Sequence, residues 1–543
     1  MAKSTASANE AKTRRWVWGL WSALAGIVSA AAFLAVAELI ALLVARESSP
    51  ILAVGAFVID IVPQPLKEFA IATFGSADKI VLLGSLALAV VIAAAIAGIL
   101  QFFVRPFGVI VIALAGVIST AAIITRTGAS PLAFVPPVIG TLVGMLVLVF
   151  LITRLRRWAG AADAADAGAP AATPADTPAA DAAEQRGLGR RSFLVATGGV
   201  GIAAVIVGVG ARLLNATSAS VDALRRELRI PEPRSTVTIP DGAELEVEGI
   251  SPLITPNADF YRVDTALTVP SVDPNTWRLV IDGMVDQRVE LSFDDLVGMG
   301  LDEYAVTLTC VSNEVGGGLV GNAIWQGVPI RDILRMAGPQ AGADMVLSKS
   351  VDGYTASTPL DALTDDARDA IFAVRMNGEP LPLEHGFPVR MVVPGLYGYV
   401  SATKWVTELK VTTFEADEAY WTPRGYAAEA PIKFSSRIDT PRTGTPVAAG
   451  TVAIAGMAWA QTVGIERVEV RIDDGDWQAA TLSTPINADT WVQWVLEWQA
   501  EAGTHYVEVR AVNKNGDTQI EERAPIAPDG SSGWQRVLVT VSA

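Results

Sequence analysis

The sequence predicts three regions: an N-terminal helical membrane domain, a central α+β domain and a C-terminal β-sandwich. Three observations support this division. Long apolar runs are confined to the part before residue 215, mixed helix and strand patterns begin at about residue 254, and short alternating strands fill residues 445–543. A chain of 543 residues is also too long for one domain. The net charge of −16 argues against a nucleic-acid partner, because no basic face is available to replace counterions.

Residues 1–158 are predicted to form a membrane domain with four transmembrane helices. Each apolar run is close to or above the roughly 20 residues that cross a bilayer as a helix. The segment from Pro50 to Phe74 is interrupted by charged residues and prolines, which predicts an interfacial or re-entrant segment. The expected spans are Trp16–Val44, Ile80–Phe103, Phe107–Ile124 and about Phe134–Ile152.

Residues 159–189 are rich in Ala, Asp, Pro and Thr and predict a disordered linker. Residues 190–214 begin with Arg190 and Arg191, followed by Ser192-Phe193-Leu194 and a mildly apolar, glycine-containing run. Two interpretations fit this segment. It is a fifth membrane span anchored by two arginines, or it is a twin-arginine export signal, which it resembles and which we favour.

Basic residues predict the orientation of the membrane domain. Lysines and arginines gather at the N-terminus, at Arg105 and at Arg154–Arg157, and the alternation of spans puts all three places on one side. The positive-inside rule makes that side cytoplasmic. With five crossings, residues 215–543 then face away from the cytoplasm. We therefore expect a multi-pass protein of the cell membrane with a cytoplasmic N-terminus and an extracytoplasmic catalytic domain.

Residues 215–250 read as a charged connector, and residues 251–425 as the central domain. Strands and helices do not alternate strictly in this domain, so an α+β fold is favoured over a doubly wound parallel sheet. The clearest expected elements are strands at Trp277–Val280, Val306–Leu308 and Pro388–Val393, and a helix at Ile330–Ala337.

Residues 440–543 predict a β-sandwich of immunoglobulin type, because six or seven short strands separated by turn signals occur in about a hundred residues. His505 follows Gly503-Thr504 and is expected to be solvated at a turn. One-face burial is clearest where apolar and charged residues alternate, in Val468, Glu469, Val470, Arg471 and Ile472.

Cys310 is the only cysteine in the chain, and it lies where a predicted strand, Val306–Leu308, opens into a loop with three glycines, Gly316–Gly318. Such a loop lets backbone approach a bulky group closely. A lone cysteine forms no internal disulfide. It is therefore a small buried apolar residue, a reactive nucleophile or a metal ligand.

The chain from about residue 254 to 540 resembles the sulfite oxidase family of molybdenum–pterin enzymes. Several motifs occur in the family's order, which makes the resemblance specific. They are Leu308-Thr309-Cys310-Val311-Ser312-Asn313, Trp325-Gln326-Gly327, Gly353-Tyr354-Thr355-Ala356-Ser357-Thr358-Pro359, Met376-Asn377-Gly378-Glu379-Pro380-Leu381-Pro382, His385-Gly386-Phe387-Pro388-Val389-Arg390, Val393-Pro394-Gly395 and Lys404-Trp405.

The resemblance implies a molybdenum held by the pterin dithiolene and by the thiolate of Cys310, and a soft thiolate suits such a metal. Tyr354 matches the family's active-site tyrosine, whose hydroxyl donates toward a metal oxo group or a bound oxyanion. The resemblance further implies a set of residues that hold the pterin and its phosphate. These are Asn257, Tyr261, Asn313, His385, Arg390, Ser401, Thr403 and Lys404.

Departures from the family pattern concern the substrate. The family follows the cysteine motif with an asparagine and two arginines, whereas Asn313 is followed here by Glu314 and Val315. An upstream segment with arginine and histidine in the family reads Asp264-Thr265-Ala266 here. Fewer cations and an added carboxylate disfavour a dianion such as sulfite. Two-electron oxygen-atom transfer is expected, with a neutral sulfoxide or N-oxide at least as plausible a substrate as sulfite.

The electron partner is expected to be a separate cytochrome or quinone-linked protein. No histidine occurs in residues 1–384 and no Cys-x-x-Cys-His motif occurs, so no haem is expected. The family commonly dimerises through its sandwich domain, which makes a homodimer an expectation here. Two other classes of protein were weighed: a non-catalytic envelope binding protein with a degenerate cofactor domain, and a transporter with an accessory outer domain. Cys310, His385 and the pair Arg390 and Lys404 argue for the enzyme.

Overall fold

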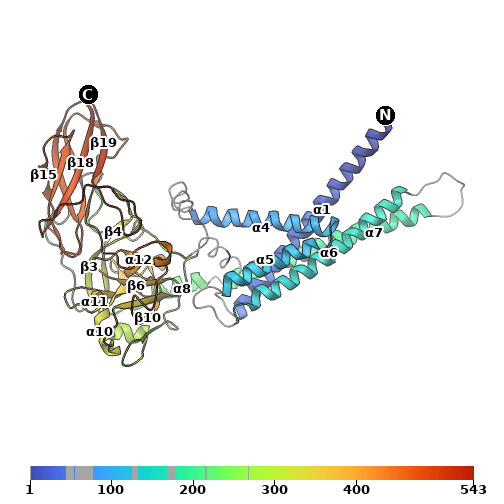
Figure 1. The fold of residues 1–543 in the computed structure, drawn as a ribbon, viewed down its shortest axis with the longest axis horizontal. Helices are drawn as coiled ribbons and strands as arrows, with labels where there is room; N and C mark the ends of the chain where they lie inside the picture. The colour runs from blue at the N-terminus through green and yellow to red at the C-terminus, as the bar shows by residue number, and fades with distance from the viewer. Residues whose placement is uncertain are drawn as a thin grey trace. The chain divides into compact units, whose positions relative to one another are not determined.

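A computed structural model describes residues 2–44, 54, 78–124, 132–167, 178–214, 217–266 and 268–543. The chain divides into two compact units, Met1–Thr217 and Ser218–Ala543 (Figure 1). Apart from residue 54, the predicted interfacial segment between Pro50 and Phe74 lies outside the described residues.

The first unit is helical, as its apolar runs predict. Five of its described helices contain a stretch long and apolar enough to cross a membrane. Glycine permits close contact between helices: a Cβ on Gly26 of α1 would lie 2.0 Å from the carbonyl oxygen of Ala94 in α4. The helices are α1 (Ala2–Val44), α4 (Asp78–Phe103), α5 (Phe107–Ile124), α6 (Val135–Ala167) and α7 (Pro178–Leu214).

The predicted disordered linker over residues 159–189 is wrong at both of its ends. α6 continues to Ala167 and α7 already begins at Pro178, while residues 168–177 lie outside the described residues. Alanine has the highest intrinsic helix propensity, so an alanine-rich segment continues a helix that an apolar run has started.

The second unit opens with α8 (Thr217–Glu227) and contains two sheets in its central part. One sheet has the order β2-β1-β10-β5-β6, and the other has the order β3-β4-β7-β8 with β9 also paired to β7. In these two sheets only β1 and β10 pair in parallel. This pairing agrees with the predicted α+β fold and differs from a doubly wound parallel sheet.

The central elements of the second unit follow in chain order. They are β1 (Arg278–Gly283), β2 (Val289–Ser292), α9 (Phe293–Gly298), β3 (Asp302–Thr309), β4 (Val320–Pro329), α10 (Ile330–Ala337), β5 (Met345–Ser350), β6 (Thr355–Pro359), α11 (Leu360–Thr364), β7 (Ile371–Met376), β8 (Glu379–Pro380), η3 (Leu383–His385), β9 (Arg390–Val392), α12 (Gly398–Ser401), β10 (Val406–Thr412) and η4 (Thr422–Arg424).

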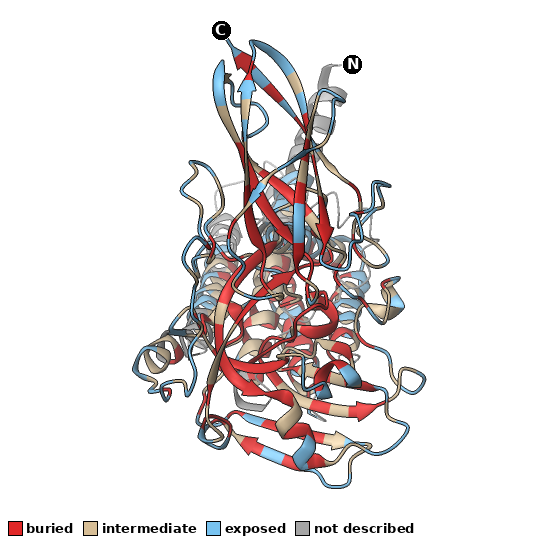
Figure 2. Cartoon of the chain, turned by 90° about the vertical axis from the view of Figure 1, so that its left-hand side faces the viewer, coloured by how far each residue is buried: buried red, intermediate tan, exposed pale blue. Residues whose placement is uncertain are grey.

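Local patterns explain the best predicted elements. The predicted helix Ile330–Ala337 is α10 residue for residue, and Gly338 ends it in the left-handed conformation at φ +69°. The strand predicted at residues 306–308 is the buried part of β3. β4 is buried along almost its whole length, whereas the last strand, β19 (Gln535–Ser542), alternates between buried and exposed residues. Figure 2 shows buried residues, in red, through the centre of this unit, and both red and pale blue segments in the strand next to the C-terminus.

The C-terminal part consists of two sheets, β11-β13-β17-β16 and β12-β19-β18-β14-β15, which share one apolar core. Valines and isoleucines of β14 and β18 pack in that core with Trp494 of β17. The two sheets are β11 (Ser435–Thr440), β12 (Val447–Ala448), β13 (Gly450–Trp459), β14 (Ile465–Ile472), β15 (Gln478–Ala479), β16 (Thr481–Leu482), β17 (Val492–Ala500), β18 (Gly503–Asn513) and β19 (Gln535–Ser542).

The prediction that His505 is merely solvated is wrong. The residue lies within β18, with Nδ1 2.5 Å from Asp473 Oδ2 and Nε2 3.0 Å from the carbonyl oxygen of Glu501. Both partners are acceptors, so both ring nitrogens must donate. This geometry suits the protonated imidazolium, and the hydrogen bond to Asp473 raises the pKa of His505. A carboxylate from the neighbouring hairpin turn, not visible in the local sequence around His505, makes the difference.

Candidate functional site

Cys310 directly follows the last residue of β3, and its side chain is buried. Its backbone N–H donates to the carbonyl oxygen of Leu319 over 3.0 Å, and the N–H of Ser312 donates to its sulfur over 3.4 Å. Burial raises the pKa of the thiol, and the Ser312 N–H only partly offsets this effect. The isolated thiol is therefore neutral at physiological pH and a poor nucleophile, which favours a metal ligand, since a metal displaces the proton.

The sulfur borders a cavity of about 120 Å³. Its walls come from the segment before β1, the turn between β5 and β6, η3 with β9, and the stretch that starts at α12. Aromatic side chains form much of the lining, which makes the cavity predominantly apolar with a few polar groups, as ligand sites commonly are. These aromatic residues are Phe260, Tyr261, Tyr354, Tyr399, Trp405 and Trp421.

Arg390, on the first residue of β9, lines this cavity and is only 5% exposed. Its Nη1 donates to the carbonyl oxygen of His385 over 3.2 Å, and its guanidinium lies 5.0 Å from the ring centre of Trp325. Within the described part of the chain, no carboxylate forms an ion pair with it. Burial lowers its pKa to about 10. A buried cation without a counter-charge is costly, so this position indicates an anionic ligand.

His385 lies beside Arg390 and lines the same cavity. Its Nε2 is 3.1 Å from the carbonyl oxygen of Asn257, an acceptor, so Nε2 carries the proton. Burial and then the charge of Arg390 lower its pKa to about 4. The ring is thus neutral at physiological pH and presents Nδ1 as an acceptor, which suits an N–H donor of a heterocycle better than a phosphate.

Lys404 also lines the cavity, but its charge is compensated. Its Nζ lies 2.8 Å from Asp264 Oδ2 and donates to the carbonyl oxygen of Glu384 over 2.9 Å. The two charged side chains are 9% and 5% exposed, and Arg262 Nε lies 3.0 Å from the same carboxylate oxygen. Burial lowers the pKa of Lys404 to about 8, although Asp264 opposes this shift. The predicted phosphate contact of Lys404 therefore competes with a protein partner.

Tyr354 lines the cavity from the turn that precedes β6. Its hydroxyl donates to the carbonyl oxygen of Tyr399 over 2.7 Å, and burial, followed by proximity to Cys310, raises its pKa well above the usual value. The phenol is neutral, and its proton is directed at the protein. Donation toward a bound oxyanion, as predicted for this residue, requires the hydroxyl to leave Tyr399. Tyr261 shares the cavity, and burial raises its pKa too.

Four other predicted cofactor residues do not line the cavity. Asn257 presents its carbonyl oxygen to His385, and the side chain of Asn313 accepts from the N–H of Leu319 over 2.8 Å. Ser401 donates its hydroxyl to the carbonyl oxygens of Leu396 and Tyr397, and Thr403 shares a hydrogen bond of 2.7 Å with Ser348. These side chains support the wall of the cavity in this structure.

Sequence reasoning missed Ser350, the last residue of β5. Ser350 lines the cavity at 3% residue exposure, and no group among the described residues forms a hydrogen bond with its buried hydroxyl. A buried polar group without a partner indicates a ligand that supplies one. Its position at a strand end, just before the motif that contains Tyr354, is the signal that was available.

The sequence predicts that Glu314 adds a carboxylate to the substrate pocket. The carboxylates that line the cavity are others. Glu314 is exposed and does not line the cavity. Asp264, recognised as a departure, and Asp352, which was not, both line it. The Asp352 carboxylate accepts from the N–H of Tyr354 over 3.2 Å and from Thr265 Oγ1 over 3.3 Å.

Comparisons with known proteins identify the family of the domain that contains this cavity. Residues 266–421 match the oxidoreductase molybdopterin binding domain family. Mitochondrial sulfite oxidase of Homo sapiens is 33% identical over 340 residues, which cover 53% of this chain and 62% of that protein. Sulfite oxidase of Gallus gallus is 30% identical over 321 residues, which cover 50% of this chain and 69% of that protein.

Among solved structures, the crystal structure of the sulfane dehydrogenase SoxCD from Paracoccus pantotrophus aligns at 23% identity with a TM-score of 0.47, and covers 54% of this chain and 82% of that one. The sequence matches define the class of protein as a molybdopterin-binding oxidoreductase. Within that class, the chain belongs to the sulfite oxidase family. It spans 62% of the human relative's length.

The residues of the cavity fit a molybdenum–pterin group. A soft sulfur ligand, Cys310, is present, as are a buried cation without a counter-charge, Arg390, and a hydroxyl without a partner, Ser350. Cys310 would ligate the metal, and Arg390 would compensate a phosphate. His385 and Ser350 would meet polar atoms of the pterin.

Proposed function

We propose that this protein is a membrane-anchored molybdenum–pterin oxidoreductase that catalyses two-electron oxygen-atom transfer on the outer side of the membrane. One observation carries the proposal. The single thiol, the buried uncompensated Arg390 and the unpartnered hydroxyl of Ser350 meet in one cavity of a domain that matches the molybdopterin-binding family. When bound, the molybdenum–pterin group supplies the redox change and the oxygen-atom acceptor or donor.

The residues of the chain would bind and orient the substrate. The aromatic walls exclude water, which strengthens polar interactions inside the cavity. Lys404 Nζ and the hydroxyls of Tyr354 and Tyr261 are the groups that can turn toward a substrate oxygen. Because Asp264 neutralises Lys404, the cavity carries little net attraction for a dianion beyond Arg390.

We infer that a neutral sulfoxide or N-oxide suits this cavity at least as well as sulfite. Its reduction consumes two electrons and two protons, releases water and leaves the sulfide or amine. The electrons would come from a separate cytochrome or quinone-linked protein. Support for the substrate preference comes from the Lys404–Asp264 pair and from Asp352, which also lines the cavity.

The membrane assignment rests on the five helices of sufficient length and apolar composition, and its orientation on the distribution of basic residues. Reporter fusions after residues 105, 158 and 250 test it. Enzymatic reporters active only outside the cytoplasm should work after residue 250 and fail after residues 105 and 158. Activity in the reverse pattern would refute the orientation.

The enzymatic proposal is tested on the full-length protein, purified in detergent from a host that makes molybdopterin. We expect roughly one molybdenum per chain, lost in Cys310→Ser, and reduction of sulfoxides or N-oxides with an artificial donor. Sulfite oxidation with an artificial acceptor is measured beside it, and rapid turnover at low sulfite concentration would overturn the substrate preference. A protein free of molybdenum and pterin would instead support a non-catalytic binding role.

A further inference from the structure

β3, the strand that directly precedes Cys310, is the outer strand of its sheet, so one row of its backbone groups has no partner strand. Residues of the C-terminal part cover this row. The N–H of Thr307 donates to the carbonyl oxygen of Asp489 over 3.0 Å, and its hydroxyl accepts from the N–H of Trp491 over 2.9 Å. Asn487 Nδ2 donates to the carbonyl oxygen of Ala305 over 3.0 Å. The cysteine strand thus depends on both halves of this unit.

The loop after Cys310 is closed on itself. The Cys310 N–H donates to the carbonyl oxygen of Leu319, and the N–H of Leu319 donates to Asn313 Oδ1 over 2.8 Å. A Cβ on Gly317 would lie 2.8 Å from the same Asn313 oxygen, so this tight closure needs glycine there. Residues 310–319 are therefore expected to move as one body, and a restraint on the loop acts on the sulfur.

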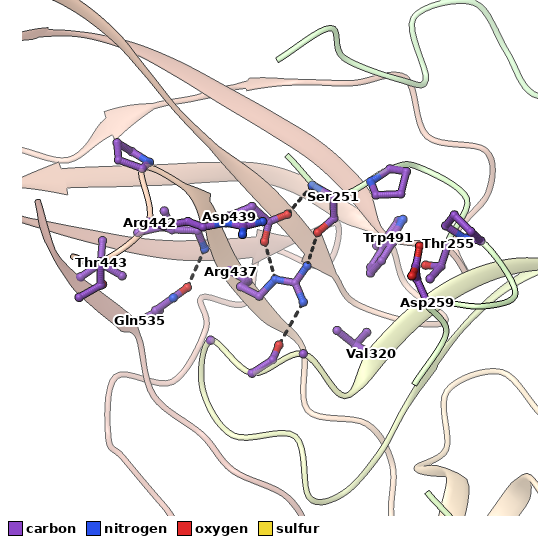
Figure 3. A pocket seen from close by; sticks show the side chains of 18 residues that line it. Ser251, Thr255, Asp259, Val320, Arg437, Asp439, Arg442, Thr443, Trp491 and Gln535 are labelled. Carbon is purple, nitrogen blue, oxygen red and sulfur yellow. Dashed lines mark hydrogen bonds and ion pairs between the residues drawn. The ribbon is translucent and has the colours of Figure 1, made fainter. Parts of the chain in front are cut away.

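Arg437 of β11 holds this loop from the C-terminal side (Figure 3). Its side chain is 9% exposed; Nη1 donates to the carbonyl oxygen of Gly317 over 3.0 Å and Nη2 to Ser251 Oγ over 2.9 Å. Nε lies 2.6 Å from Asp439 Oδ1, which fixes the plane of the guanidinium. Figure 3 shows the guanidinium reaching across toward the loop.

A second contact reaches the same loop at its other end. Ser531 Oγ donates to the carbonyl oxygen of Asn313 over 2.7 Å. Gln535 packs under Gly316, whose φ is +80°, and a Cβ there would lie 2.6 Å from Gln535 Nε2. The three glycines of the loop also line a cavity of about 410 Å³, so apolar packing restrains them little. Discrete hydrogen bonds from the C-terminal part therefore supply much of the restraint.

We propose that Arg437 and Ser531 are positioning residues for Cys310, and that the C-terminal sandwich is a working part of the metal site although it supplies no ligand. The inference rests on the proposed function, because it takes Cys310 as the metal ligand. Neither residue lines the Cys310 cavity. They act through the backbone of residues 313 and 317, which sets where the thiol can lie.

Alkylation of the thiol tests the proposal, because Cys310 is the only cysteine and every adduct reports on it. The full-length protein is made without molybdenum, purified in detergent and treated with iodoacetamide at fixed pH. Ser531→Ala and Arg437→Lys should each raise the labelling rate about tenfold, since each removes one restraint on local opening. Arg437→Lys keeps a charge beside Asp439 while losing the planar fork.

The matched controls also remove a serine hydroxyl and an arginine guanidinium, but at positions whose hydrogen bonds do not reach the loop. Ser532→Ala removes the neighbouring hydroxyl, which donates to the carbonyl oxygen of Glu522, and Arg471→Lys removes a fork that pairs with Glu508 inside the sandwich. Both controls should label at the native rate. The increase in the test variants should depend only weakly on low urea concentrations, as local opening does. Native rates in the test variants, or equal increases in the controls, would overturn the proposal.

The same variants are then made with molybdenum. We expect Ser531→Ala and Arg437→Lys to lose the metal to a chelator about tenfold faster than the controls, because a mobile thiolate holds it less well. Equal loss in test and control variants would contradict the positioning role. If the native protein binds no molybdenum, the proposed function fails, while the labelling rates still decide whether the C-terminal part restrains the loop.

Discussion

Two regions of the molecule place an arginine over a tryptophan, with opposite surroundings. In the cavity at Cys310, Arg390 lies 5.0 Å from the ring centre of Trp325, is buried, and has no carboxylate partner among the described residues. On the outer face of the sandwich, Arg510 lies 4.2 Å from the ring centre of Trp477 and pairs with Glu469 at 2.7 Å. The first charge has no carboxylate partner among the described residues, whereas the second is paired with a carboxylate of the same sheet.

The difference shows how to recognise a site in this fold. Exposed, paired charges contribute little to stability and need no ligand. A buried charge or hydroxyl that the protein leaves unpaired costs free energy, and it persists where a ligand recovers that cost. Ser350 beside Arg390 follows the same logic. Lys404 is the intermediate case, since it is buried but paired with Asp264.

The largest effect is expected from breaking the buried ion pair of Lys404 and Asp264. Lys404→Met removes one of the two cations that pair with the Asp264 carboxylate, which is 5% exposed, and leaves Arg262 Nε 3.0 Å from it. We expect a loss of about 2–3 kcal/mol in the free energy of unfolding, at the low end for breaking a buried pair because Arg262 remains. Urea unfolding of the metal-free protein measures it. The double variant Lys404→Met with Asp264→Asn should recover most of the loss, and no recovery would show that Lys404 acts mainly through packing.

Arg390→Gln removes the unpaired charge. We expect cofactor retention to fall about 10–100-fold, because a charge-assisted contact to a phosphate is lost. The metal-free protein should be no less stable, since a buried cation without a counter-charge is removed. Arg510→Gln is the control on the sandwich and should leave cofactor content unchanged. Equal cofactor loss in both variants would contradict a specific role of Arg390 in holding the cofactor.

Asp264→Asn removes the carboxylate that pairs with Lys404. Lys404 then resembles Arg390, a buried cation that lines the cavity without a carboxylate partner among the described residues. We expect anions to enter the cavity more readily, with the KM for sulfite about tenfold lower and little change for a neutral sulfoxide. Steady-state kinetics with both substrates, as a function of salt, measure the shift. An unchanged KM for sulfite would mean that Lys404 does not face the substrate.

The smallest effect is expected from the His505–Asp473 pair in the C-terminal sandwich. The hydrogen bond to Asp473 raises the pKa of His505, and although burial of Asp473 opposes it, the His505 contact leaves the pKa of Asp473 lowered. The pair therefore stabilises fully only between roughly pH 4 and 6.5, the ordinary values of the two groups. Its contribution is lost as pH rises through the raised pKa of His505.

His505→Gln should remove this pH dependence and cost less than about 1 kcal/mol at pH 6, because the pair is partly exposed. Thermal unfolding at pH 6 and pH 9 measures it. A native protein equally stable at both pH values, or a variant with the same pH slope as the native protein, would contradict the pair's role.

Much of the fold could be predicted because its signals are local. The apolar run at Phe107–Ile124 and the amphipathic pattern at Ile330–Ala337 each match an observed helix over the same residues. The alternation from Val468 to Ile472 lies within β14. Where local composition pointed the other way, as in the alanine-rich segment after residue 159, the disorder prediction was wrong because alanine propagates a helix.

The candidate site likewise has features that the sequence could predict and features that it could not. The sequence by itself determined that Cys310 lies between a strand and a glycine-rich loop, and the family motifs named Tyr354, His385 and Arg390 as further residues of the site. Only the tertiary structure decided which charges are paired. Lys404 meets Asp264 across 140 residues, Arg390 meets no carboxylate of the described chain, and distant strands hold the cysteine loop. Backbone periodicity is a property of neighbours in the chain, whereas desolvation and charge compensation depend on which distant residues folding brings together.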